Sequence, residues 1–309
     1  MDIPSIDLGE LTRGDALVPL QEACEEWGFF HLTGHEIPME LREALLNEMA
    51  AFFALPTSIK ERIERTDENP WGFYNRELTK NVLDWKEIFD VGPEEGTRTP
   101  QWPLGNTSFR RTVEAFYGAS ERVAKALVQS IAASLGAPST SLDGCFQDHT
   151  SYLRLNYYPL CDDPADARSP TVPDDGALGI SHHSDAGAVT VLLQDGVTGL
   201  QVERKGQWHD VSARRGGLIV NIGDVVQVWS NDRYKAPLHR VLASDQRVRY
   251  SAPFFLNPSY ATHYAPLPGA CVDRPPAYRP IHWGTFRAGR AAGDYADVGE
   301  EIQIAHYRI

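Results

Sequence analysis

Cysteine is scarce in this sequence, with four among 309 residues. The four lie far apart and form no Cys-X-X-Cys pair, at positions Cys24, Cys145, Cys161 and Cys271. This spacing excludes a disulfide framework or a zinc site built on neighbouring cysteines as the basis of the fold. Such cysteine usage is typical of the reducing cytosol, so we expect a cytoplasmic location.

Long apolar runs and an excess of positive charge are also missing. No stretch has the length needed to cross a bilayer, and the first residues lack a basic segment followed by an apolar one. Only 29 Lys and Arg residues stand against 42 Asp and Glu residues, which gives a net charge of -13. Because such a surface repels phosphates, we expect no nucleic-acid partner, and because no apolar run is long enough, we expect no membrane partner.

No internal repeat is evident, and 42% hydrophobic with 23% charged residues is typical of a globular protein. One domain of this length is plausible, because barrels and sandwiches often exceed the usual domain size. We expect a single domain over residues 1–309. Within it we distinguish a helix-rich part over 1–150, a jelly-roll core over 151–265 and a carboxy-terminal cover over 266–309.

Apolar residues recur at helical spacing in three segments of the first half. They predict helices over residues 16–27, 39–53 and 112–135, each followed by a glycine or a proline that ends it. A short apolar run at 29–32 predicts a strand between the first two helices. We expect the third helix to brace the sheet that follows in the chain.

After residue 151 the pattern changes to short alternating or β-branched runs separated by turn residues. These runs predict strands over residues 152–158, 188–193, 200–202, 218–222, 225–229 and 248–255. Evenly spaced short strands favour a jelly roll or barrel over a parallel α/β sheet. The segment 161–179 is rich in Pro, Asp, Ser and Gly, and we interpret it as either a surface loop or a lid.

Two potential metal ligands are one residue apart in His183-Ser184-Asp185. Side chains at positions i and i+2 of an extended strand project from the same face, so both can reach one ion. His239 offers a third ligand from a different strand. Two imidazoles and one carboxylate form the facial set that suits non-haem iron(II) oxygenases. Such a site keeps positions free for an anionic 2-oxo acid and for dioxygen.

Other readings of these histidines are open. An isolated His-X-Asp pair occurs by chance, and a histidine in a β-rich protein is often a structural residue. His182 competes with His183, but strand alternation points it to the face opposite Asp185. The remaining histidines have no such partners and are interpreted as structural or surface residues: His31, His35, His149, His209, His263, His282 and His306.

A possible clamp for the 2-oxo acid follows in Arg249-Tyr250-Ser251, where two polar side chains again share one face of a strand. Arginine binds a carboxylate through two parallel hydrogen bonds, and the serine hydroxyl adds a donor. The pair suits the distal carboxylate of 2-oxoglutarate, whereas a surface arginine beside a strand serine is the alternative. On the strand 152–158, Arg154, Asn156 and Tyr158 form a polar face that either lines a cavity or is exposed at a sheet edge.

Further motifs extend over nearly the whole chain. In the first half they are Ala23-Cys24-Glu25-Glu26-Trp27-Gly28-Phe29-Phe30, Phe53-Ala54-Leu55-Pro56 and Asp84-Trp85-Lys86-Glu87. In the second half they are Leu155-Asn156-Tyr157-Tyr158-Pro159, His183-Ser184-Asp185-Ala186-Gly187, Leu192-Leu193-Gln194-Asp195, Gly199-Leu200-Gln201-Val202, Asn221-Ile222-Gly223-Asp224, Ser230-Asn231-Asp232-Arg233-Tyr234-Lys235, His239-Arg240-Val241 and Arg249-Tyr250-Ser251. Together they resemble the isopenicillin N synthase-like family of 2-oxoglutarate- and iron(II)-dependent dioxygenases.

This resemblance implies a distorted double-stranded β-helix, a cupin-like jelly roll that is mostly β with flanking α-helices. It also implies residue roles. The catalytic metal ligands for Fe(2+) are His183, Asp185 and His239, and the 2-oxoglutarate ligands are Arg249 and Ser251, assisted by Asn156 and Tyr158. Two departures from the family pattern, at Ser184 and at Gly34-His35-Glu36, touch no ligand and concern only the subfamily.

We therefore expect an oxidoreductase that uses Fe(2+), 2-oxoglutarate and O2 to oxidise a C-H bond of a small organic or amino-acid-derived metabolite. Hydroxylation, desaturation and cyclisation are all compatible with it, with release of succinate and CO2. One alternative is an oxidase of the same fold that needs no 2-oxoglutarate, and another is a non-catalytic small-molecule sensor. Tyr74, Phe255, Asn257 and Tyr260 are candidates to line the substrate pocket, with core packing as the alternative for each.

Overall fold

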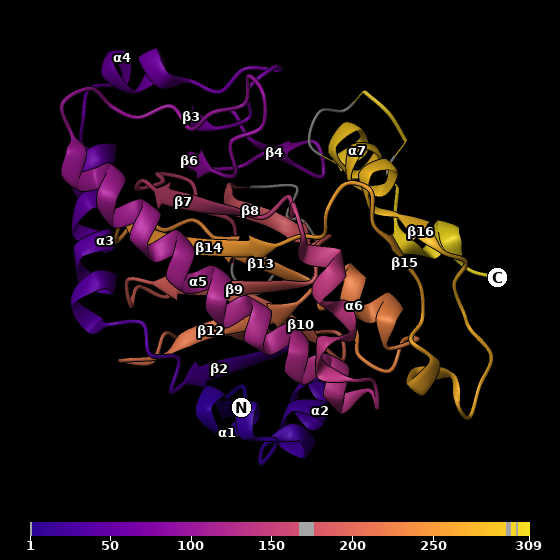
Figure 1. Cartoon of the computed structure of the whole chain (residues 1–309). Helices are drawn as coiled ribbons and strands as arrows, with labels where there is room; N and C mark the ends of the chain where they lie inside the picture. Colours follow the sequence, from indigo (N-terminus) through magenta and orange to yellow (C-terminus); the bar gives the residue numbers. More distant parts are fainter. Residues whose placement is uncertain (1, 167–175, 295–297, 301) are drawn as a thin grey trace.

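The computed structural model describes residues 2–166, 176–294, 298–300 and 302–309. Two β-sheets lie at its centre, and helices cover the outer face of the larger one (Figure 1). The larger sheet has the strand order β1 (Ser5–Asp7), β2 (Phe29–Thr33), β12 (Leu218–Ile222), β9 (Val189–Gln194), β14 (Arg249–Leu256), β7 (Tyr152–Tyr158), β6 (Glu87–Val91) and β3 (Gly72–Tyr74). The smaller sheet has the order β11 (Gln207–Asp210), β10 (Leu200–Arg204), β13 (His239–Leu242) and β8 (Leu178–His183).

Two short ribbons and the helices complete the described architecture. The ribbons pair β4 (Leu78–Thr79) with β5 (Val82–Leu83) and β15 (His263–Tyr264) with β16 (Ile281–His282). The α-helices are α1 (Leu8–Arg13), α2 (Leu17–Glu26), α3 (Met39–Phe53), α4 (Thr57–Lys60), α5 (Thr107–Ser134), α6 (Asp224–Trp229) and α7 (Trp283–Asp294). Short 3-10 helices lie at Glu61–Ile63, Ser139–Phe146, Pro268–Cys271 and Ile304–Tyr307.

Strand alternation divides the interior into two cores. On β9, Val191 and Leu193 face the helices and belong to the larger core, whereas Leu192 faces the smaller sheet and belongs to the second core. The larger core is closed by α5, which lies across the strands of the larger sheet in Figure 1. The second core fills one end of the space between the two sheets, where Val202 of β10 is fully buried.

Helix α5 begins five residues earlier than the periodicity predicts, at Thr107 instead of 112. The side chain of Asn106 accepts a hydrogen bond from the backbone N–H of Phe109 and caps the helix. Because Phe109 is fully buried, the additional turn extends the apolar face of the helix over the larger sheet. The predicted bracing helix is therefore present and longer than expected.

The strand predicted over residues 225–229 is wrong, because this segment forms helix α6. Its backbone N–H groups bond within the segment, from Val226 to the carbonyl of Gly223 and from Ser230 to that of Val226. Valines of a buried helix and of a buried strand look alike over so few residues. The segment interpreted as a loop or a lid, 161–179, lies partly outside the described residues at 167–175, and its end enters β8 at Leu178.

Candidate active site

A cavity of about 430 Å³ lies between the two sheets. Inward-facing residues of β7, β9, β12 and β14 form one wall, and residues of β8 and β13 form the other. Residues 65–67 and 70–71 and helix α7 also contribute to the lining. Its volume lies in the range of small-molecule sites.

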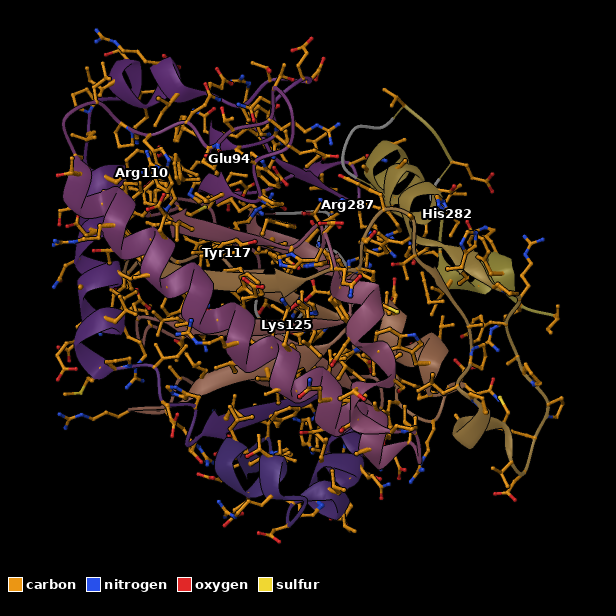
Figure 2. All side chains as sticks on the ribbon, in the orientation of Figure 1. Glu94, Arg110, Tyr117, Lys125, His282 and Arg287 are labelled. Carbon is orange, nitrogen blue, oxygen red and sulfur yellow. The ribbon has the colours of Figure 1, made fainter. Side chains whose placement is uncertain are left out.

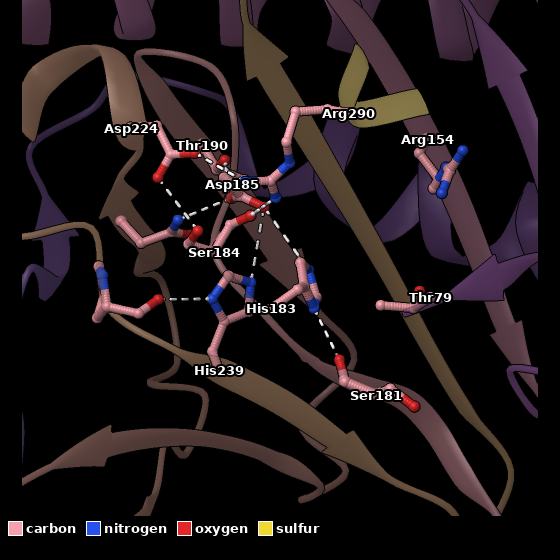
Figure 3. A network of polar contacts seen from close by, with 12 residues as sticks. Thr79, Arg154, Ser181, His183, Ser184, Asp185, Thr190, Asp224, His239 and Arg290 are labelled. Carbon is pink, nitrogen blue, oxygen red and sulfur yellow. Dashed lines mark hydrogen bonds and ion pairs between the residues drawn. The ribbon is translucent and has the colours of Figure 1, made fainter. Parts of the chain in front are cut away.

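His183, Asp185 and His239 meet on the wall of this cavity (Figure 3). His183 is the last residue of β8 and His239 the first of β13, and the two lie opposite each other in the antiparallel pairing. Asp185 follows β8 in a short loop. Each histidine Nε2 is 3.7 Å from Asp185 Oδ1, and the three potential ligand atoms lie within 4.8 Å of one another. These distances suit three ligands on one face of an ion.

The two histidines present the nitrogen that a metal needs. His183 Nδ1 is 2.8 Å from the carbonyl oxygen of Ser181, and His239 Nδ1 is 3.2 Å from that of Pro237. Since a carbonyl only accepts, each Nδ1 carries the proton and each Nε2 directs a lone pair toward Asp185. Burial and the neighbouring His239 lower the pKa of His183 to about 3, which keeps this imidazole neutral.

The two carboxylate oxygens of Asp185 have different contacts: one accepts hydrogen bonds from the protein, and the other faces the two histidines. Oδ2 accepts hydrogen bonds from Thr190 Oγ1 and, at 2.8 Å, from Asn221 Nδ2. Burial raises the pKa of Asp185, but the adjacent imidazoles and these two donors outweigh it, so the net pKa is lowered. The buried carboxylate therefore stays ionised, and a divalent cation would balance its charge.

Helix α7 holds the loop between the candidate ligands (Figure 3). Arg290 Nη2 donates to the carbonyl of Ser184 at 3.1 Å, and its Nη1 donates to Asp224 Oδ2 at 3.0 Å. Ser184 Oγ donates to the other oxygen of Asp224, also at 3.1 Å. This network ties the loop to α6 and α7 at once.

Strand pairing also assembles the residues considered for 2-oxoglutarate. In the register of β14 with β7, Arg249 lies opposite Tyr158 and Ser251 lies opposite Asn156. The Arg249 guanidinium carbon is 4.9 Å from the centre of the Tyr158 ring, and Asn156 Nδ2 donates to Ser251 Oγ at 3.4 Å. All four line the cavity.

Some buried polar atoms at and beside Arg249 have no hydrogen-bond partner among the described residues. One of its nitrogens donates to Gln194 Oε1 at 2.6 Å, an interaction that fixes the guanidinium without neutralising it. Among the described residues, Arg249 Nε and Asn156 Oδ1 are buried polar atoms with no hydrogen-bond partner. Unpaired buried polar atoms are costly, so their clustering in a cavity marks a place for a polar ligand.

The four residues considered for the substrate separate into two pairs. Phe255 and Asn257 line the cavity, and Phe255 stacks on Tyr152 with ring centres 4.7 Å apart. Tyr74 lies on β3 beneath the guanidinium of a neighbouring arginine, and Tyr260 is 39% exposed on a loop. Neither tyrosine is among the described lining residues.

A buried network of charges that no motif in the sequence indicates shares the cavity wall. Two nitrogens of Arg154 are each 2.8 Å from the oxygens of Asp90, and a third is 2.9 Å from Glu77 Oε1. Arg65 is 2.8 Å from the other oxygen of Glu77. Burial raises the pKa of Glu77, but Arg154, Arg65 and Lys86 lower it to about 2. The polar strand face pointed to Arg154, but nothing in the spacing indicated its partners.

Two arginines of α7, Arg287 and Arg290, also line the cavity and were not anticipated. No motif marks them, because the tail is a stretch of mixed charge without recognisable spacing. Among the helices that the structure describes, none combines the length and the apolarity needed to cross a bilayer.

Both halves of the chain match known protein families. Residues 149–258 match the 2OG-Fe(II) oxygenase superfamily, and residues 3–108 match the family described as non-haem dioxygenase in morphine synthesis N-terminal. The first match contains the three candidate metal ligands and the residues of β7 and β14 described above. The first family match therefore agrees with the geometry of the cavity.

Individual relatives agree with these matches. A protein of Oryza sativa subsp. japonica named 2-oxoglutarate-dependent dioxygenase 11 is 32% identical over 295 residues, 93% of this chain and 80% of the relative. The crystal structure of JOX2 in complex with 2OG, Fe and JA is similar at a TM-score of 0.85 and 27% identity, covering 100% of this chain and 90% of that one. The crystal structure of the dioxygenase for auxin oxidation in rice is similar at a TM-score of 0.78 and 26% identity, covering 100% of each chain.

These similarities confirm the double-stranded β-helix fold expected from the sequence, with two sheets and flanking helices. They also confirm the expected cofactors, Fe(II) and 2-oxoglutarate, for which the clustered His183, Asp185 and His239 form a facial triad. The chain belongs to the 2OG-Fe(II) oxygenase superfamily and is a 2-oxoglutarate- and Fe(II)-dependent dioxygenase that acts on small metabolites.

Proposed function

We propose that this enzyme binds iron(II) through His183 Nε2, Asp185 Oδ1 and His239 Nε2 and oxidises a C-H bond of a small organic or amino-acid-derived metabolite. Hydroxylation, desaturation and cyclisation all fit this proposal, each with release of succinate and CO2. The observation that carries it is the convergence of the three ligand atoms, within 4.8 Å of one another, on the wall of a small-molecule cavity.

The ligand chemistry suits the ion. Imidazole and carboxylate groups bind iron(II), and three protein ligands on one face leave neighbouring positions for co-substrate and dioxygen. An ion held by these residues would supply the activation of dioxygen, with electrons from 2-oxoglutarate and the substrate. The protein contributes fixed ligand orientation, through the carbonyls of Ser181 and Pro237 and through the donors to Asp185.

We place the distal carboxylate of 2-oxoglutarate on Arg249 and Ser251, with Asn156 and Tyr158 beside it. This placement is supported by an arginine that is held by Gln194, faces the cavity and has no carboxylate partner among the residues that the structure describes. We place the substrate against Phe255 and Asn257. Tyr74 and Tyr260 stay predictions, and they would contact only a substrate that extends beyond the described cavity.

The decisive experiment measures succinate and oxidised product together while candidate metabolites are supplied with iron(II), 2-oxoglutarate and dioxygen. We expect one succinate for each product, and loss of both in His239→Ala. His263→Ala, the same change at an exposed residue of β15, is the matched control and keeps activity. Product without succinate would show the oxidase alternative, and binding without dioxygen consumption would show the sensor alternative.

We further propose a single domain over residues 1–309, a cytoplasmic location, and no nucleic-acid or membrane partner. Residues of all three predicted parts of the chain, such as Arg65, Arg154 and Arg287, line one cavity, which supports a single domain. The four cysteines are free, which supports a reducing compartment. The net charge of -13 argues against nucleic acid and anionic lipid surfaces.

A further inference from the structure

The arginine and lysine side chains that line the cavity differ in their counter-ions. Carboxylates lie within ion-pair distance of most of them, namely Arg65 and Arg154 with Glu77 and Asp90, Lys86 with Asp84, and Arg290 with Asp224. Among the described residues, no carboxylate lies within ion-pair distance of the other two, Arg249 and Arg287. Since the chain has 42 acidic against 29 basic residues, such cations stand out.

Arg249 is already assigned to 2-oxoglutarate, which leaves Arg287 without a ligand. Arg287 is half-buried on α7, and Figure 2 shows it on the side of the helix that faces the sheets. Its guanidinium carbon is 5.4 Å from the centre of the Tyr152 ring and 6.0 Å from that of Trp283. Aromatic faces attract a cation and orient it, but they leave its charge available to an anion.

The position of Arg287 places that charge near the reaction centre. Arg290 lies one helical turn further along α7 and contacts the carbonyl of Ser184, between the two ligands of the β8 loop. Helical residues three apart are neighbours, roughly 5–6 Å between Cβ atoms. An anion on Arg287 would therefore lie beside the part of α7 that contacts the metal-binding loop.

The wall beside Arg287 is aromatic. Tyr152 lies between Phe255 and Trp71, with ring centres at 4.7 Å and 6.1 Å, and all three line the cavity. The wall therefore offers flat apolar contacts to a molecule whose charged end reaches the arginine.

We propose that Arg287 binds a carboxylate of the primary substrate, so that the enzyme oxidises small organic acids with an apolar, cyclic or planar body. A carboxylate fits better than a phosphate, because one planar guanidinium forms two parallel hydrogen bonds with it and no second unpaired cation lines this part of the described wall. The inference rests on the proposed function in one respect, namely that the oxidised molecule occupies this cavity.

Calorimetric titration tests the proposal without turnover. The protein is loaded with iron(II) and 2-oxoglutarate under nitrogen and titrated with phenylacetate, phenylpropionate, phenylbutyrate and cyclohexylacetate, and with the uncharged amide of each. We expect at least one acid to bind about ten- to a hundredfold more tightly than its amide, as a charge-assisted hydrogen-bonded pair predicts. If no acid binds more tightly than its amide, the proposal is overturned.

Variants then assign the preference to one side chain. Arg287→Gln is expected to bind acid and amide with similar affinity, and Arg287→Lys to keep part of the preference. Arg111→Gln removes the same charge from the exposed face of α5 and is expected to keep all of it. Affinity for 2-oxoglutarate should stay unchanged in Arg287→Gln, which shows that the cavity is intact. An undiminished acid preference in Arg287→Gln overturns the proposal.

Succinate and product formation with the same acids separate this inference from the proposed function. An acid preference that depends on Arg287, without oxidised product from any bound acid, supports the anion site and contradicts C-H oxidation in this cavity. Coupled product formation that is indifferent to Arg287 supports the oxidation and overturns the anion site.

Discussion

At Asp185 the two oxygens of one carboxylate have different surroundings, and this difference positions the side chain. Oδ2 is held by Thr190 and Asn221, which leaves Oδ1 directed at the two imidazoles. Asn221 lies on β12 and Thr190 on β9, which are adjacent strands with these two residues opposite each other. The sheet register therefore fixes the orientation of the carboxylate.

Replacing Asn221 tests this support. In Asn221→Leu, Asp185 Oδ2 loses one of its two donors, so the carboxylate is less well oriented. We expect the dissociation constant for a probe metal such as Co(2+) to rise about ten- to a hundredfold. Calorimetric titration of the metal-free protein measures it, with Asn47→Leu on the exposed side of α3 as the control. Equal metal affinity in the two variants would show that the Asn221 contact is dispensable.

Gly223 lies so close to the metal loop that a side chain does not fit. A Cβ at this position would be 2.3 Å from the carbonyl oxygen of Gly187 and 2.7 Å from that of Asp185. Both neighbours are backbone atoms and cannot rotate away. The motif Asn221-Ile222-Gly223-Asp224 thus owes its glycine to close packing beneath the loop.

We expect Gly223→Ala to displace the loop, with a loss of about 1–3 kcal/mol in the free energy of unfolding and a marked fall in metal affinity. Urea unfolding and metal titration measure the two effects. Gly144→Ala is the matched control, because a Cβ there has open space around it and the backbone is not left-handed. A Gly223→Ala protein with unchanged stability and metal affinity would contradict the packing argument.

Helices and strands whose type follows from the local apolar pattern were predictable from the sequence. Those whose type depends on tertiary contacts were not. The helix over 39–53 and the strand over 152–158 have their predicted bounds, because each has a long enough apolar period. The strand over 218–222 also has its predicted bounds, although it is as short as the segment 225–229. Over 225–229 the pattern is too short to decide. The chain turns there after β12, and hydrogen bonds within the segment replace strand pairing.

The same distinction applies to the site. The parity of Asn156 with Tyr158 is a local feature that a single strand determines. The spacing of His183 and Asp185 pointed to the ligand pair, although only His183 is in β8 and Asp185 lies in the loop that follows. The partners of Arg154 and the contacts of α7 join segments far apart in the chain. Only the folded sheets bring these segments together, and no spacing in the sequence records such contacts.

Helix α7 is held to α6 by a buried ion pair, whose arginine also contacts the metal loop. Arg290 and Asp224 are 2% and 3% exposed, and Arg290 also donates to Gln303 at 2.7 Å. Removal of one partner leaves the other charge buried and uncompensated, which costs about 3–5 kcal/mol. The pair therefore couples the position of α7 to the stability of the loop.

Arg290→Met tests this coupling, because methionine keeps apolar volume and removes the charge. We expect a fall of about 3–5 kcal/mol in the free energy of unfolding, measured with urea. Addition of Asp224→Asn should restore part of it, since the unpaired carboxylate is then gone. A double variant no more stable than Arg290→Met would show that the loss comes from packing and not from charge.

Across the whole molecule, buried carboxylates make stability depend on pH. Glu77 and Asp90 form ion pairs with Arg154 of β7, and Glu77 also forms one with Arg65. These ion pairs join the amino-terminal part of the chain to the larger sheet. Glu77 is 5% exposed, so solvent screens its interactions little. A group of this kind contributes to folding only while it is ionised.

The sign of the pH effect follows from the lowered pKa of Glu77, about 2 against an ordinary value of 4.5. Its contribution is complete above pH 4.5 and is lost as the pH falls toward 2, because the unfolded chain then binds the proton first. We expect Glu77 alone to account for about 2 kcal/mol of the unfolding free energy lost between about pH 6 and pH 3.

Urea unfolding over this pH range measures the effect in Glu77→Gln and in Glu94→Gln, an exposed control. The Glu77 variant should be less stable at neutral pH, because Arg154 and Arg65 lose a charged partner, and its stability should fall less steeply with acid. The Glu94 variant should keep the original slope. If the unfolding free energy falls equally steeply with acid in both variants, other carboxylates govern acid unfolding. The reason is that a glutamine at position 77 takes up no proton as the pH falls.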